Sequence, residues 1–122
     1  MIKRLLLFSF FFATNLMAKE AIVCPLLYLS SVKKMVESNG NFDKFKHCSV
    51  SCLLTLRCPA DEVLELGILK ELMDVVGPGS AEKADLKADY LGVKLAVSTE
   101  GIDDKECMKA CHSLYPEVSC PN

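Results

Sequence analysis

Apolar and polar residues follow one another along this chain with the period of amphipathic helices. The pattern falls into five stretches separated by breaks that contain Asn, Gly or Pro. We predict helices at 25–38, 42–57 and 60–76, from Ser80 to the break that begins at Ser98, and from Asp103 or Asp104 to about Tyr115. No stretch has strand-like alternation. The expected fold class is therefore all-α, a small disulfide-stapled bundle of about five helices.

Two of these helices carry marked faces. The helix at 42–57 places one set of residues at i, i+3, i+4 and i+7, namely Phe45, Cys48, Ser49, Cys52, Leu53 and Leu56. The helix at 60–76 is apolar around more than half its circumference, which predicts that it is the central helix. Its remaining arc holds Gly67, Lys70, Glu71 and Asp74.

The fourth helix is divided into separate faces. Small residues, among them Ala88 and Gly92, form a stripe that permits close approach of a neighbouring helix. Asp85 and Asp89 lie one step around from that stripe, so we expect them near a packing seam. A further face carries lysines that we expect in water: Lys83, Lys87 and Lys94.

The N-terminus has the order of a secretory signal peptide. Lys3 and Arg4 precede an apolar block that runs to about Ala13, and Ala18 offers a small residue at the cut. We expect a signal peptide at 1–18, a single domain at 19–122 and an exported bacterial product, periplasmic or secreted. The apolar block is shorter than the roughly 20 residues that span a bilayer, so no transmembrane segment is expected in the mature chain.

The net charge of the chain limits the classes of partner that we expect. The net charge of −2 becomes about −4 once Lys3 and Arg4 are removed with the leader. A mildly acidic chain without a basic patch argues against a nucleic-acid partner. A protein or cell-envelope component remains as the expected partner.

Seven cysteines suit an exported domain that disulfides stabilise. Cys48/Cys52 and Cys107/Cys111 have the same i, i+4 spacing, so two antiparallel helices would pair Cys48 with Cys111 and Cys52 with Cys107. Cys58 and Cys120 would then form a third pair. About 105 pairings are possible, and sequence alone does not select one.

Cys24 is the odd residue in that scheme. It can be a free thiol, an intermolecular bond that links two chains into a dimer, or a partner of Cys58 or Cys120. Zinc is a rival interpretation, since His47 and His112 flank the two cysteine pairs. The common zinc knuckles use C-x2-C, so we predict neither a metal nor a cofactor.

One group of residues has the composition of an acid–base site. The candidate catalytic residues are His47, Glu71, Asp74, Asp85 and Asp89. If their helix faces converge, a histidine and several carboxylates can divide general acid and general base roles. The alternative is solvated surface carboxylates, and a histidine packed beside a disulfide. G-x-S-x-G, H-E-x-x-H and C-x-x-C motifs do not occur, which leaves serine hydrolase, zincin and thiol oxidoreductase activities without support.

Short motifs between Phe42 and Leu95 resemble a small helical module of bacterial secreted proteins that also occurs at the C-termini of some Rhs-type polymorphic toxins. The matching residues are Lys46-His47-Cys48, Ser51-Cys52, Gly67, Lys70-Glu71, Asp74, Ala84-Asp85, Ala88-Asp89 and Gly92. The module more often has asparagine where this chain has Asp89. The resemblance implies that the candidate residues form one constellation, and it makes toxin-like hydrolysis in the cell envelope the enzyme hypothesis to test.

Two functions therefore remain open. The first is an extracytoplasmic binding or inhibitory module that presents a rigid stapled surface to a partner. The alternative is a small envelope-targeting hydrolase or toxin-like effector that uses the His47 cluster. Convergence of the carboxylates with His47 in a concave site would favour the hydrolase.

Overall fold

Five helices follow one another in the computed structural model, which describes residues 22–40, 42–76 and 83–116. Their bounds are α2 (Val23–Glu37), α3 (Asp43–Thr55), α4 (Ala60–Val76), α5 (Lys83–Ser98) and α6 (Asp104–Leu114). No strand occurs within these ranges, so the predicted all-α class is confirmed. The leader at 1–18 and Ser80, the predicted start of the fourth helix, lie outside the described residues.

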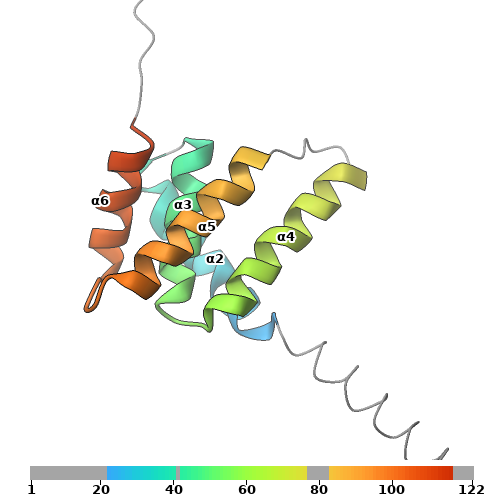
Figure 1. The fold of residues 1–122 in the computed structure, drawn as a ribbon, viewed down its shortest axis with the longest axis horizontal. Coiled ribbons are helices and arrows are strands. Elements are labelled where there is room, and N and C mark those ends of the chain that lie inside the picture. The colour runs from blue at the N-terminus through green and yellow to red at the C-terminus, as the bar shows by residue number, and fades with distance from the viewer. Residues whose placement is uncertain (1–21, 41, 77–82, 117–122) are drawn as a thin grey trace, which may run out of the picture.

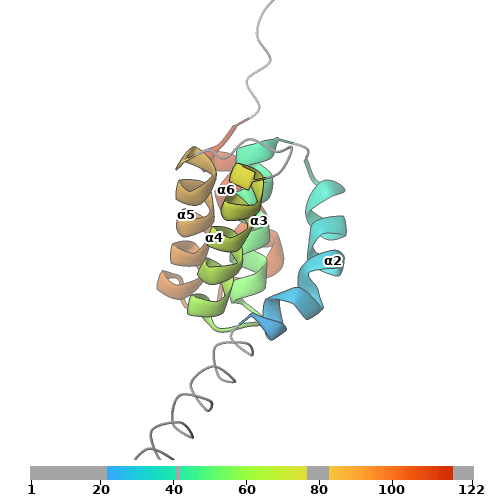
Figure 2. The same cartoon turned by 90° about the vertical axis from the view of Figure 1, so that its right-hand side faces the viewer.

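The centre of the bundle is α3, with α6 and α4 on opposite sides of it (Figure 1). A second view, turned by 90°, shows α2 along a further side of α3 (Figure 2). Phe45, Leu53 and Leu54 of α3 are almost fully buried, against Val32 and Val36 of α2. The helix is buried because its apolar residues and both cysteines recur at helical spacing, and because neighbouring helices also cover the small polar residues Ser49 and Ser51.

The prediction that residues 60–76 form the central helix is wrong. α4 lies at the edge of the bundle (Figure 1), and large apolar side chains on it remain exposed. Two covalent links and a close backbone contact tie α3, and not α4, to its neighbours. The apolar periodicity of α4 shows which residues the helix carries on each face. It does not show which other helices cover those faces.

The close backbone contact joins α3 to α5 at Gly92. A Cβ atom at this position would lie 2.1 Å from the carbonyl oxygen of Cys48, so only glycine fits. Ala88, one turn earlier, is fully buried. The small-residue stripe predicted from the sequence is therefore the seam between α5 and α3.

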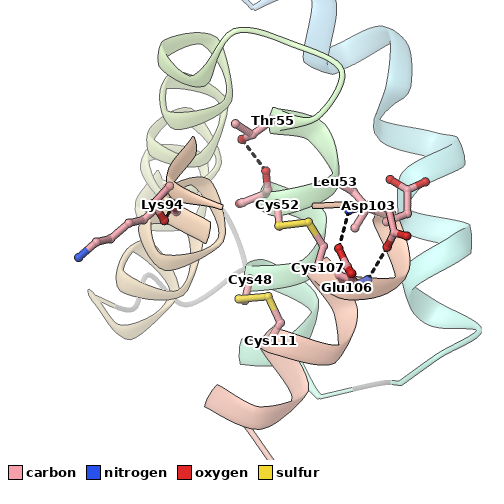
Figure 3. Close-up of a disulfide and its surroundings, with 12 residues drawn as sticks. Cys48, Cys52, Leu53, Thr55, Lys94, Asp103, Glu106, Cys107 and Cys111 are labelled. Carbon is pink, nitrogen blue, oxygen red and sulfur yellow. Dashed lines mark hydrogen bonds between the residues drawn. A yellow bond between two sulfur atoms is a disulfide. The ribbon is translucent and has the colours of Figure 1, made fainter. Parts of the chain in front are cut away.

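Two disulfides join α3 to α6 as the i, i+4 spacing predicted. Cys48 bonds to Cys111 and Cys52 to Cys107, and the two bonds lie one turn apart (Figure 3). All four cysteines are fully buried. A disulfide of this kind stabilises a small domain by about 2–4 kcal/mol, chiefly by restricting the unfolded chain.

The third disulfide differs from the expected one. Cys58 bonds to Cys24, over a sequence separation of 34, which confirms one of the alternatives left open for Cys24. The pairing of Cys58 with Cys120 and the free or intermolecular Cys24 are wrong. The bond fastens the start of α2 to the segment between α3 and α4. Cys120 lies outside the described residues. Three disulfides are typical of proteins that fold in an oxidising, extracytoplasmic compartment.

Polar contacts set the position of α6. Asp103 accepts a hydrogen bond from the backbone N–H of Glu106 at 2.8 Å, and the Glu106 side chain accepts one from the Asp103 N–H at 3.1 Å (Figure 3). Asp104 forms two parallel hydrogen bonds with Arg57, at 2.8 and 2.6 Å. The guanidinium of Arg57, opposed by burial, lowers the pKa of Asp104. These contacts lock the start of α6 to the end of α3.

None of the helices in the described ranges is long and apolar enough to cross a bilayer.

Candidate functional site

A cleft of about 240 Å³ lies among α2, α3 and α4. Its walls are mainly apolar and come from all three helices: Leu29, Val36, Val50, Leu54, Val63 and Leu66. His47, Ser51 and Asp89 form a polar end near Lys70, and further charged residues also line the cleft: Lys33, Glu37, Asp43 and Lys46. The cleft therefore combines an apolar body with charged groups.

His47 reaches this polar end from α3, one residue before the disulfide-bonded Cys48. Its side chain is only 10% exposed. The ring donates from Nδ1 to Asp89 Oδ1 at 2.9 Å, while Nε2 faces two further carboxylates, Asp85 at 3.6 Å and Asp43 at 3.8 Å. The two ring nitrogens thus face different carboxylate groups, which fixes the orientation of the imidazole.

Asp89 connects three helices. From α5, its Oδ1 accepts hydrogen bonds from His47 and from the Ser51 hydroxyl at 3.1 Å. Its Oδ2 is buried and has no hydrogen-bond partner among the described residues. A Cβ on Gly67 of α4 would lie 2.7 Å from Oδ2, so the missing side chain at 67 makes the room that this oxygen occupies.

A lysine pairs with the other two carboxylates. The ammonium of Lys44 forms ion pairs with Asp43, at 3.1 Å, and with Asp85. Asp85 is buried, whereas Asp43 is exposed at the start of α3. Burial alone would raise the pKa of Asp43, but the hydrogen bond donated by Lys44, hydrogen bonding with Asp85, and the charges of His47 and Lys44 lower it overall.

The surrounding charges also change the pKa of His47. Burial would lower this pKa, because it disfavours the charged imidazolium. The hydrogen bond and the negative charge of Asp89, helped by the charge of Asp85, outweigh burial and raise the pKa above its usual value. Lys70 opposes them. The net effect favours the imidazolium form.

Glu71 and Asp74 lie on α4 and contact a different cation. Lys70 Nζ is 3.1 Å from Asp74 Oδ2 and 3.7 Å from Glu71 Oε1. Burial by itself would lower the pKa of Lys70, but the hydrogen bond to Asp74 and the neighbouring carboxylates raise it. Glu71 is buried, and Asp74 is partly buried.

Asp43, His47 and Asp85 form the one set of residues that could hold a metal ion within the described ranges. One ligand atom from each lies within 4.8 Å of the others. Asp89 on Nδ1 would orient the histidine, as acidic groups behind metal-bound histidines commonly do. Lys44 already supplies positive charge to both carboxylates, however, so a divalent ion would compete with an ammonium at its own ligands.

Among the predicted site residues, the structure thus brings His47, Asp85 and Asp89 together, and it places Glu71 and Asp74 around Lys70. Sequence reasoning missed Asp43 and Lys44. Asp43 stands one helical turn before His47, and this i, i+4 spacing was the signal that could have identified it. His112 takes no part in the cluster: its ring lies edge-on to Phe45, with centroids 6.0 Å apart.

The structure therefore defines a small all-α protein stapled by three disulfides, with a buried ionic cluster at one end of an apolar cleft. No family model matches the chain, and no curated protein or solved structure is significantly similar to it.

Proposed function

We propose that this protein is an exported interaction module that binds an apolar side chain of a protein partner in the cleft among α2, α3 and α4. The observation that carries the proposal is the cleft itself, with six apolar side chains around it and a charged end. An apolar anchor in a preformed pocket, with polar groups at the rim, is the usual arrangement of a binding hot spot.

The size of the cleft supports an anchor side chain in preference to a cofactor. Pockets for small-molecule ligands commonly measure about 300–1,000 Å³. The cleft, at about 240 Å³, is smaller than that range. It suits one leucine-sized or phenylalanine-sized group of a larger partner.

The charges also favour binding over catalysis. A general base needs a neutral imidazole nitrogen directed at its substrate, but Nε2 of His47 faces Asp85 and Asp43. The raised pKa of His47 further favours the imidazolium. With Lys44 on Asp43 and Asp85, the cluster consists largely of paired charges that make one end of the cleft rigid.

Export is part of the proposal. The leader at 1–18 and the three disulfides support a periplasmic or secreted bacterial protein. The partner is then another protein of the envelope or the extracellular space.

The test uses a minimal anchor as its probe. N-acetyl-leucine amide is titrated into the oxidised protein at millimolar concentration, and backbone NMR shifts are followed. We expect shifts at cleft residues such as Val50 and Leu66, and none at Leu27, which is exposed on α2 outside the cleft.

A matched pair of variants completes that test. Val50→Phe fills the cleft and should abolish the shifts, whereas Leu27→Phe adds the same group outside it and should leave them unchanged. Shifts that are absent in the wild type, or that survive in Val50→Phe, would contradict the proposal.

The hydrolase remains the second candidate, favoured by the 2.9 Å contact between His47 and Asp89. A carboxylate on Nδ1 orients a catalytic histidine in many hydrolases. The resemblance to modules of Rhs-type toxins suggests an envelope substrate. Release of dye from labelled peptidoglycan tests this function. Loss of release in His47→Ala and Glu71→Gln at an unchanged melting temperature would favour it, and absence of release by the wild type would exclude this substrate.

A further inference from the structure

The outer side of α4 is apolar, as the buried side of a helix normally is. Glu71 is 6% exposed, whereas Leu72 is 59% and Val75 67% exposed. Helices at a protein surface normally bury the apolar face and expose the charged one. Here the polar arc faces the ionic cluster, and a contiguous set of apolar side chains faces outward, which marks an interaction surface.

The contact between Gly67 and Asp89 shows on which side of α4 this surface lies. These two residues meet at the seam between α4 and α5, which run side by side (Figure 1). Leu66 lines the cleft on one side of Gly67. Successive residues advance by 100° around a helix, so Ile68 and Val75 lie on the other, outer side of the seam.

α5 extends the same surface. Leu86, Tyr90 and Val97 are exposed and share one face of the helix. Gly92 lies on the side of Asp89 opposite to this exposed stripe, and it packs against α3. The exposed stripe of α5 is therefore also on the outer side of the seam, next to that of α4. We refer to Ile68, Leu72, Val75, Leu86 and Tyr90 as the outer face.

Opposite charges flank the outer face. Asp61 and Glu65 are exposed on α4, each seven residues before an exposed member of the stripe. On α5 an exposed lysine stands three residues before each apolar residue of the stripe: Lys83, Lys87 and Lys94. None of these three lysines forms an ion pair within the described residues. One helix thus presents acids, and the other presents bases that have no ion-pair partner in the described part of the chain.

We infer that the outer face binds a second copy of this chain. A two-fold axis parallel to the helices places α4 of one copy on α5 of the other, so each apolar stripe meets an apolar stripe. Gly67 of α4 is level with Asp89 of α5. Glu65, two residues before Gly67, is therefore level with position 91, two residues after Asp89.

At this level Glu65 lies between Lys87 and Lys94 of the second copy. Along the helix axis it is about 6 Å from Lys87 and about 4.5 Å from Lys94. The surface is therefore complementary to itself in charge as well as in polarity. An anionic lipid surface fits less well, because Asp61 and Glu65 would face it and the whole chain has a net negative charge.

Sedimentation equilibrium of the oxidised, exported protein tests this inference. All samples carry Cys120→Ser, so that the seventh cysteine cannot link two chains covalently. We expect a reversible dimer whose dissociation constant rises about tenfold in Leu72→Glu. Leu27→Glu, an equally apolar and more exposed position on α2, should leave the constant unchanged.

Charge reversal gives a second, independent readout. Glu65→Lys and Lys87→Glu should each raise the dissociation constant about threefold, and the double variant should recover part of the loss. A monomeric wild type, or a dimer that Leu72→Glu does not weaken, would overturn the inference. A monomer that instead binds phosphatidylglycerol vesicles through Leu72 would assign the outer face to lipid.

Discussion

Asp89 is the residue on which the cluster depends most. Its Oδ1 accepts hydrogen bonds from His47 and Ser51 on α3, and its Oδ2 lies against Gly67 on α4. A buried carboxylate is stable only where donors or a positive charge compensate for the loss of water. Here the His47 ring and the Ser51 hydroxyl supply the donors.

Removal of the charge at 89 should therefore lower the pKa of His47. We predict a lower pKa in Asp89→Asn, because the carboxylate raises it in the wild type. The measurement is an NMR titration of the His47 ring protons. Asp104→Asn, which removes a carboxylate at the start of α6, is the control and should leave the His47 titration as it is. An unchanged His47 pKa in Asp89→Asn would contradict the assignment.

The same pKa makes stability depend on pH. A histidine whose pKa is raised by folding stabilises the protein fully below its unfolded pKa of about 6.5. This contribution is lost as the pH rises through the higher folded value. We predict that the free energy of unfolding from urea titrations falls over this window in the wild type. The fall should be smaller in Asp89→Asn, and equal slopes in the two proteins would count against the linkage.

Two glycines should respond differently to alanine. In Gly92→Ala the new Cβ meets the backbone of Cys48, which cannot move, and we expect a loss of about 2–3 kcal/mol. In Gly67→Ala it meets only the end of the Asp89 side chain, and the gain in helix propensity offsets part of the strain, so the loss should be under about 1 kcal/mol. Urea denaturation checks both values, and equal losses would be inconsistent with the seam described at Gly92.

At the scale of the helices, the sequence predicted all five elements and two of the three disulfides. Local periodicity determines where a helix forms, and the i, i+4 spacing of Cys48/Cys52 and Cys107/Cys111 is a local property too. The position of α4 was not predictable in this way. It depends on which neighbours cover a helix, and those are remote in sequence.

The same distinction between local pattern and remote neighbours explains which residues of the site were predictable. His47, Asp85 and Asp89 were predictable because each lies on a face that its own helix turns inward. Lys44 was missed because a lysine beside an exposed aspartate looks like solvated surface until α5 brings Asp85 to it. The bond of Cys24 to Cys58 likewise depends on how α2 folds back, which no spacing encodes.

That disulfide should act mainly on α2. Because the Cys24–Cys58 bond fastens the start of α2, we predict that Cys24→Ala with Cys58→Ala costs about 2–4 kcal/mol of stability. Amide hydrogen exchange should accelerate first in α2, one wall of the cleft, and less in α3 and α6. The control is Cys52→Ala with Cys107→Ala, which should accelerate exchange in α6. Uniform acceleration by both pairs would contradict separate roles for the two disulfides.

The whole molecule is a small domain in which the disulfides and the ionic cluster use different faces of α3. Two disulfides and the Arg57–Asp104 pair fix α6, while the His47 cluster connects α3 to α5 beside the cleft. The third disulfide holds α2, one wall of the cleft, to the segment between α3 and α4. The proposed binding of an anchor side chain and the proposed self-association both rely on this arrangement of helices.

Disulfide mapping of the exported protein is the most direct test of that arrangement. Free thiols are alkylated before digestion, and linked peptides are identified by mass spectrometry without reduction. Trypsin leaves Cys48 and Cys52 on one peptide, so fragmentation at Val50 must separate them. We expect the bonds Cys24–Cys58, Cys48–Cys111 and Cys52–Cys107. A bond between Cys58 and Cys120, or alkylated Cys48 and Cys52, would contradict that arrangement.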